Sequence, residues 1–287
     1  MTTLTPPTPP TADAPRSPEP GGKPPRHPAA IPVTVILSVL GAALIVGTVV
    51  AGVATTVASS SASVTETLSA PTDGVTEIDV EVAAVNLDVV FADVDEARLD
   101  LVDTPGGWRL ERDGDELQVS SPSGSWFSFG WSPFNGDGRA TLTLPRSLEG
   151  VDASFTVGAG ELVADGRFGE LDVDVSAGGL TVSGDARSLS ATVGAGSADL
   201  RLAGVSEAEF EVAAGDMDAH LTGRAPREVS IEVSAGSLDL TLPDGAYDVR
   251  SDVSAGEVDN RLPSGSGTRI PVEVRVSAGD VTLRPAN

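Results

Sequence analysis

Residues 171–182 read LDVDVSAGGLTV, and apolar residues alternate with polar ones on both sides of a central Ser-Ala-Gly step. Alternation with a period of two is typical of half-buried β-strands. The small residues of the central step suit a sharp corner, because they allow a close approach of the backbone. The stretch therefore predicts a short strand, a tight corner and a second strand.

The same pattern recurs along the chain. The element Val-x-Ala-Gly occurs seven times, at spacings of 18, 18, 19, 21, 20 and 23 residues: Val157–Gly160, Val175–Gly178, Val193–Gly196, Val212–Gly215, Val233–Gly236, Val253–Gly256 and Val276–Gly279. An eighth, degenerate copy is Val82–Val85, where valine replaces glycine. A unit of this length with two strands and no helical period is typical of a β-solenoid rung, although hairpins would also supply two strands. Because the pattern repeats in phase, we predict an all-β, right-handed parallel β-solenoid of about eight short rungs over residues 75–287.

Composition and charge exclude several classes of function. The 287 residues include 42 acidic and 18 basic ones, giving a net charge of −24, which excludes a protein that binds nucleic acid through its phosphates. There is no cysteine, so disulfides and thiolate metal sites are excluded. The only histidines are His27 and His220, too few for a multi-histidine metal site within one chain. We expect no cofactor.

The first 57 residues differ from the rest. Residues 1–30 are rich in proline, and we expect a disordered tail that is either simply solvated or a ligand for a proline-binding module. The run Val33–Val57 is apolar and uncharged, and about 20 such residues cross a bilayer as a helix. We therefore predict a transmembrane helix over 31–57, with a cleaved signal peptide as the alternative. Residues 58–74, rich in serine and threonine, are predicted to be a linker.

The charges on either side of the apolar run predict its orientation. Arg16, Lys23 and Arg26 precede it, and the next basic residue is Arg98. The positive-inside rule then places the N-terminus in the cytoplasm and residues 75–287 outside the cell membrane.

If the rungs stack, two acidic columns fall in consecutive rungs. One contains Asp199, Asp218, Asp239 and Asp259, and the other contains Glu211, Glu232 and Asp252. Like charges roughly 5 Å apart repel, so something must compensate. One hypothesis is a bound calcium ion, which prefers oxygen ligands. The interpretation we favour is ion pairing with arginines two residues further along the same face, such as Arg201 in Asp199-x-Arg201. His220 lies in the same column, either as a general base or as an ordinary exposed strand residue.

One segment interrupts the repeat. Residues 121–138 are rich in glycine, serine and proline and contain five aromatic residues: Trp126, Phe127, Phe129, Trp131 and Phe134. These form either a contact surface for a protein, glycan or membrane headgroup, or a plug that covers the open end of the stack.

Three motifs resemble a bacterial family commonly labelled "putative adhesin" with β-strand repeats. They are the Ala-Gly-(Asp/Glu)-Val step at 255–258 and 278–281, the hairpin-like stretch at 108–119, and ATLTLPRSL at 140–148. The resemblance covers about residues 75–287. It implies an envelope-associated solenoid, in some members linked to stress responses, and it supplies no catalytic residues.

Together these features predict a non-catalytic binding, adhesin-like or structural module anchored in the bacterial cell membrane. Its expected partners are the membrane, through one helix, and an envelope protein or glycan, with no nucleic acid. One alternative is an envelope-stress sensor that couples an outside ligand to the cytoplasmic tail. Another is a carbohydrate-active enzyme, since β-solenoids host such activity, although no spacing in the sequence singles out a pair of carboxylates.

Overall fold

The structure is a computed structural model that describes residues 63–122, 138–263 and 269–286. The strands are β1 (Ser63–Ala70), β2 (Glu77–Val82), β3 (Asn86–Ala92), β4 (Ala97–Pro105), β5 (Arg109–Asp113), β6 (Glu116–Ser120), β7 (Arg139–Pro145), β8 (Asp152–Val157), β9 (Glu161–Val175), β10 (Gly179–Val193), β11 (Ser197–Ala203), β12 (Glu207–Val212), β13 (Asp216–Thr222), β14 (Glu228–Val233), β15 (Ser237–Leu242), β16 (Tyr247–Val253), β17 (Gly256–Asn260), β18 (Ile270–Val276) and β19 (Gly279–Pro285). A short 3₁₀ helix, η2 (Arg146–Leu148), precedes β8. The described part of the chain is therefore all-β, as predicted.

The predicted tail and transmembrane helix at residues 1–57 and the aromatic cluster Trp126–Phe134 lie outside the described residues. Within the described ranges, no helix is long and apolar enough to cross a membrane.

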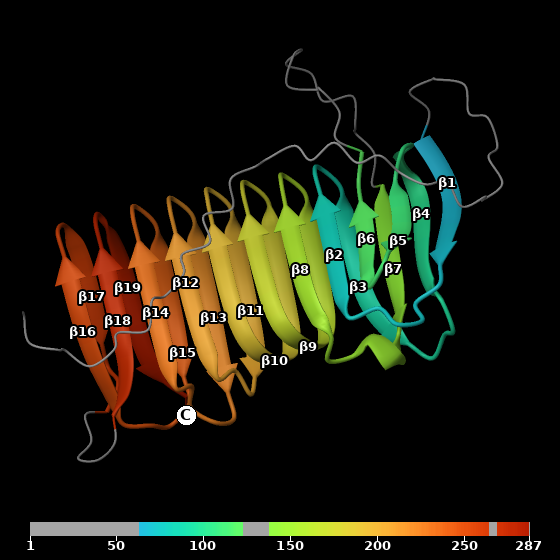
Figure 1. Cartoon of the computed structure of the whole chain (residues 1–287). Helices are drawn as coiled ribbons and strands as arrows, with labels where there is room; N and C mark the ends of the chain where they lie inside the picture. Colours follow the sequence, from blue (N-terminus) through green and yellow to red (C-terminus); the bar gives the residue numbers. More distant parts are fainter. Residues whose placement is uncertain (1–62, 123–137, 264–268, 287) are drawn as a thin grey trace, which may run out of the picture. The chain divides into compact units, whose positions relative to one another are not determined.

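The repeated units pair with one another through parallel strands (Figure 1). The two strands of a unit do not form a hairpin, because each pairs with the equivalent strand of a neighbouring unit. In the middle of the stack, Leu162 of β9 is opposite Leu180 of β10, which is opposite Ala198 of β11. The register therefore follows the sequence repeat.

The strands form two rows joined by the Val-x-Ala-Gly corners. Row 1 contains, in stacking order, β5, β6, β2, β8, the C-terminal halves of β9 and β10, β12, β14, β18 and β16. Row 2 contains β1, β4, β7, β3, the N-terminal halves of β9 and β10, β11, β13, β15, β19 and β17.

The core lies between the two rows and is made by every second side chain. The valine that opens each corner is an example: seven of the eight are at most 2% exposed, namely Val82, Val157, Val175, Val193, Val212, Val233 and Val276. The largest fully buried side chains are Phe155 and Phe210, each 1% exposed. Because the space is narrow, aliphatic residues fill most of it, which explains the low aromatic content.

The corner glycines are required by close backbone contact. A Cβ on Gly196 would lie 2.2 Å from the carbonyl oxygen of Gly178, and one on Gly178 would lie 2.3 Å from that of Gly160. Each Cβ would point toward the preceding unit, so alanine does not fit. Val85 stands at the glycine position of the degenerate copy, whose neighbouring strands on that side are β6 and β7, separated in sequence by residues 121–138.

The units do not stack in sequence order at the C-terminal end, contrary to our expectation. β14 pairs with β18 and β15 with β19, while β16 and β17 pair with the far sides of β18 and β19. The last unit of the chain is thus inserted between its two predecessors. Asp239 is consequently opposite Thr282, which separates it from Asp259.

The N-terminal end also departs from prediction. Residues 63–70, assigned to a linker from their serine and threonine content, form β1, which pairs antiparallel with β4. β4 is antiparallel to β7, so the sheet is mixed and not entirely parallel. The predicted hairpin at 108–119 is present as the antiparallel pair β5–β6.

Candidate functional site

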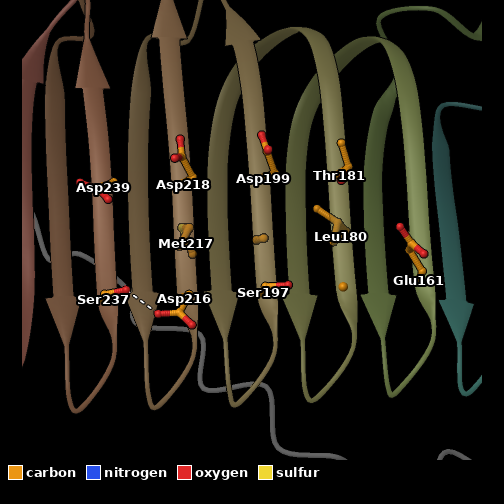
Figure 2. Close-up of a pocket in the computed structure, with 12 residues that line it drawn as sticks. Glu161, Leu180, Thr181, Ser197, Asp199, Asp216, Met217, Asp218, Ser237 and Asp239 are labelled. Carbon is orange, nitrogen blue, oxygen red and sulfur yellow. Dashed lines mark hydrogen bonds between the residues drawn. The ribbon is translucent and has the colours of Figure 1, made fainter.

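The predicted aspartate column lies on the outward side of row 2. Asp199, Asp218 and Asp239 occupy equivalent positions on β11, β13 and β15 (Figure 2). They line a shallow hollow of about 360 Å³, which extends over Thr181 to Glu161. Asp259 is not adjacent to Asp239, because Thr282 of the inserted β19 lies between them.

Arginine compensates three of these four aspartates. Arg201 lies 2.8 Å from Asp199 (Nη2 to Oδ2), and Arg284 lies 2.8 Å from Asp239 (Nη2 to Oδ1). The hydrogen bond from Arg261, 2.9 Å from Nε to Oδ2, lowers the pKa of Asp259. These contacts match the ion-pairing hypothesis.

The described residues contain no group of three histidine or acidic side chains placed to hold a metal ion. One oxygen of Asp199, Oδ1, is buried without a hydrogen-bond partner. His220, between Arg201 and Thr241 in neighbouring strands, is half-buried on the outward face. The geometry of row 2 thus brings three predicted aspartates together but supplies no metal cluster among the residues described.

The outward side of row 1, between β6 and β14, is more acidic than row 2. It carries 13 carboxylates and no lysine or arginine: Glu77, Asp79, Glu81, Glu116, Asp152, Glu170, Asp172, Asp174, Glu207, Glu209, Glu211, Glu228 and Glu232. The other outward positions of these strands hold serine, threonine or glutamine.

Seven of these carboxylates form what we call the acidic strip, along the two columns nearest the corners: Asp79, Glu81, Asp172, Asp174, Glu209, Glu211 and Glu232. The strands of the strip alternate: Asp79-x-Glu81 on β2 is followed by Ser154-x-Thr156 on β8, and Asp172-x-Asp174 on β9 by hydroxyl side chains on β10. Acidic pairs therefore recur at every second strand, about 9.6 Å apart at the usual strand spacing.

The strip has no ion-pair partner among the described residues. The third outward column, which is the farthest from the Val-x-Ala-Gly corners, differs because two arginines pair with it. Arg187 lies 3.0 Å from Asp152, and Arg227 lies 3.6 Å from Glu207. The strip thus presents uncompensated negative charge.

Burial and like charge raise the pKa of carboxyls at the β2 end of the strip. The pKa of Asp79 is raised to about 6, mainly by desolvation and then by the nearby carboxylates Glu116, Glu81 and Glu77. Desolvation also raises the pKa of Glu77, with Glu116 and Asp152 adding to the effect. Both shifts arise because the negative form is poorly solvated among other negative groups.

The arrangement suits electrostatic recognition of a cationic partner. The carboxylates are held by a fully paired sheet, so they form a stiff, regular array. The row 2 aspartates and a column through Glu211 and Glu232 were predicted from the sequence, whereas the alternating acidic pairs that make the strip were not. The signal was available: the strand before each corner alternates between acidic pairs, as in Glu209-x-Glu211, and hydroxyl pairs, as in Ser190-x-Thr192.

Comparisons with known proteins give fold-level similarities only. No family model matches the sequence, and no curated protein is similar to it. Among solved structures, the chain is similar to a "putative adhesin" from Parabacteroides merdae, with 14% identity and a TM-score of 0.43 over 77% of this chain and 96% of that one. It is also similar to a "putative adhesin" from Bacteroides fragilis (12%, TM-score 0.41, 77% and 96%) and to a "putative cell adhesion protein" from Clostridium sporogenes (12%, TM-score 0.37, 78% and 100%). These similarities assign no function to this chain.

Proposed function

We propose that this chain is a single-pass protein of the bacterial cell membrane that holds a right-handed β-solenoid outside the cell. We further propose that it acts by binding a partner and not by catalysis. The observation that supports binding is the acidic strip, whose seven carboxylates lack ion-pair partners among the described residues. The apolar run Val33–Val57, preceded by Arg16, Lys23 and Arg26, supports the anchor and its orientation.

The proposed partner carries positive charge at its surface. A basic envelope protein or a glycan with free amino groups has this chemistry, and long-range attraction to the strip would speed its association. Rigid presentation lowers the entropic cost of binding, since the strip does not have to be ordered first.

A matched pair of variants tests this role of the strip. Binding of a labelled fragment, residues 58–287, is measured on cells from which the protein has been deleted. The strip variant replaces Asp172, Asp174, Glu209 and Glu211 by the corresponding amides. The control variant makes the same change of net charge on row 2, at Glu161, Asp216, Asp218 and Asp280.

We expect the strip variant to bind at least tenfold more weakly and the control to bind like the parent. Equal losses in both would show that only net charge matters, and unchanged binding of the strip variant would refute a role for the strip. The anchor is tested separately. Deleting residues 33–57 should release the protein from membranes, and protease added to intact cells should cleave the parent within residues 75–287.

A further inference from the structure

The C-terminal unit, β18–β19, occupies a place that sequence order gives to β16–β17. β18 pairs with β14 on one side and with β16 on the other, and the same residues of β18 take part in both pairings. Val274 of β18, for example, is opposite Ile231 of β14 and Ser251 of β16. In row 2, Leu283 is likewise opposite both Leu240 and Asn260. The two flanking units are therefore already in register with each other.

Because of this shared register, β16–β17 can dock directly on β14–β15 without a shift of residues. The inward pattern would be kept, since Val249 would lie beside Val229 and Val253 beside Val233. Direct docking requires only that residues 270–285 leave their place between the two units.

Charge favours the inserted position. In the strand register, Arg275 of β18 is opposite Glu232 of β14 and Asp252 of β16, and its guanidinium forms an ion pair with Glu273 of its own strand, 3.1 Å from Nη2 to Oε2. Arg284 of β19 pairs with Asp239 at 2.8 Å and also contributes to the lowered pKa of Asp259, after Arg261. Without the insert, Glu232 would meet Asp252, and like charges directly opposite each other destabilise strand pairing.

Apolar burial favours the same position. The inward residues of the insert are aliphatic, and Val272, Val274 and Leu283 are at most 1% exposed. The unit at the open end instead has polar residues at two inward positions, Ser251 and Asn260, both of which are exposed. The inserted order thus leaves the more polar unit on the unpaired edge, where it discourages association with other strands.

We propose that residues 270–285 form a latch with two positions. In the inserted position, Arg275 and Arg284 hold two acidic units apart. In the withdrawn position, β16–β17 docks on β14–β15 in the register that the insert already defines, and the C-terminal strands become available to pair elsewhere. The latch borders the acidic strip at one residue, because Glu232 at the β14 end of the strip is opposite Arg275.

Disulfide trapping tests the latch in the full-length, membrane-bound chain, which has no cysteine of its own. The pair Ser237→Cys/Asp280→Cys reports insertion, because these positions are opposite each other. The pair Ser237→Cys/Glu257→Cys reports withdrawal. With the insert present, its members are two strands apart, about 9.6 Å, beyond the roughly 7 Å between Cα atoms that a disulfide spans.

In the parent background we expect the insertion pair to crosslink and the withdrawal pair to remain reduced. Arg275→Glu/Arg284→Glu should raise crosslinking of the withdrawal pair at least tenfold and lower that of the insertion pair. Val274→Asp, which places a charge in the core of the insert, should act in the same direction without touching either arginine. Reversal of two exposed arginines on β5, at the other end of row 1, Arg109→Glu/Arg112→Glu, should leave both yields unchanged.

Failure of the insertion pair to crosslink in the parent would overturn the proposal. It would also be overturned if neither Arg275→Glu/Arg284→Glu nor Val274→Asp raised the yield of the withdrawal pair. Circular dichroism of each variant before oxidation separates movement of the latch from unfolding, since withdrawal keeps the other strands paired.

Discussion

Replacing Asp79 by asparagine should stabilise the protein at neutral pH. Asp79 lies in β2 between Gln118 and Ser154, half-buried and close to Glu77 and Glu81. Its pKa is raised from 3.8 to about 6, first by desolvation and then by the neighbouring carboxylates. A raised pKa for an acid means that the folded protein binds the proton more tightly than the unfolded chain does. The charged form of Asp79 therefore opposes folding.

The sign and size of the effect follow from proton linkage. Below pH 3.8 the carboxyl is protonated in both states and has no effect. As the pH rises from about 4 to about 6, the unfolded chain loses the proton first, and stability falls; above pH 6 the full cost is present. Each pKa unit corresponds to about 1.4 kcal/mol, and partial exposure reduces the total, so we expect about 1–3 kcal/mol. For a unit of this size, that is a rise in Tm of about 2–10 °C at pH 7.5.

Thermal and urea unfolding of residues 58–287, followed by far-ultraviolet circular dichroism from pH 3.5 to 8, measures the effect. Asp79→Asn should exceed the parent in stability at pH 7.5, and the gain should vanish toward pH 3.5. Asp174→Asn is the matched control: it makes the same change at an exposed position of the strip, and we expect less than about 0.5 kcal/mol. A gain that does not depend on pH, or a loss at pH 7.5, would refute the argument from desolvation.

Four further predictions concern the corner glycine, the tyrosine and calcium. Gly196→Ala should prevent folding or destabilise it severely, because its Cβ would lie 2.2 Å from a carbonyl oxygen of the preceding unit; Gly179→Ala, with no neighbouring atom closer than 3.8 Å, should be neutral in the same urea titration. Burial raises the pKa of Tyr247, the only tyrosine, to about 12, so its ionisation, followed by near-ultraviolet absorbance, should begin two pH units higher in folded than in unfolded protein. Tyr247→Phe, which removes the 2.6 Å hydrogen bond to the carbonyl oxygen of Pro243, should cost about 0.5–1.5 kcal/mol in urea unfolding. Calcium should raise the Tm of the same fragment by no more than about 2 °C, because arginines already compensate Asp199 and Asp239 on either side of Asp218; a larger rise would revive the calcium hypothesis.

The repeat could be predicted from sequence because each unit contains the residues that specify its strands and its corner. Alternation such as Leu171-x-Val173-x-Val175 specifies a strand. A corner glycine such as Gly178 is required because a Cβ there would clash with the backbone of the preceding unit. Both signals are local, and they fix the register between neighbouring units.

The stacking order at the ends could not be predicted from the same signals. All units have the same alternation of apolar and polar residues relative to the corner, so this pattern allows any unit to stack on any other. We therefore assumed that they stack in sequence order. The actual order depends on contacts distant in sequence, such as Arg275 between Glu232 and Asp252. β1 was missed for another reason: Ser63–Ala70 has a linker-like composition, and its pairing with β4 is what makes it a strand.

The acidic strip shows how a stacked sheet can carry high negative charge. Two unit charges on adjacent strands, about 4.8 Å apart, repel by about 0.9 kcal/mol in water-like surroundings, and at about 9.6 Å by half as much. Physiological salt screens charges over about 8 Å, so alternate-strand spacing places most acidic pairs just beyond that length. The Glu211–Glu232 step breaks the alternation, and Arg275 lies opposite Glu232 on the next strand, although its ion pair is with Glu273. The alternate-strand spacing reduces the repulsion between carboxylates that would otherwise destabilise the sheet. It also leaves the carboxylates of the strip without ion-pair partners and therefore available to a cationic ligand.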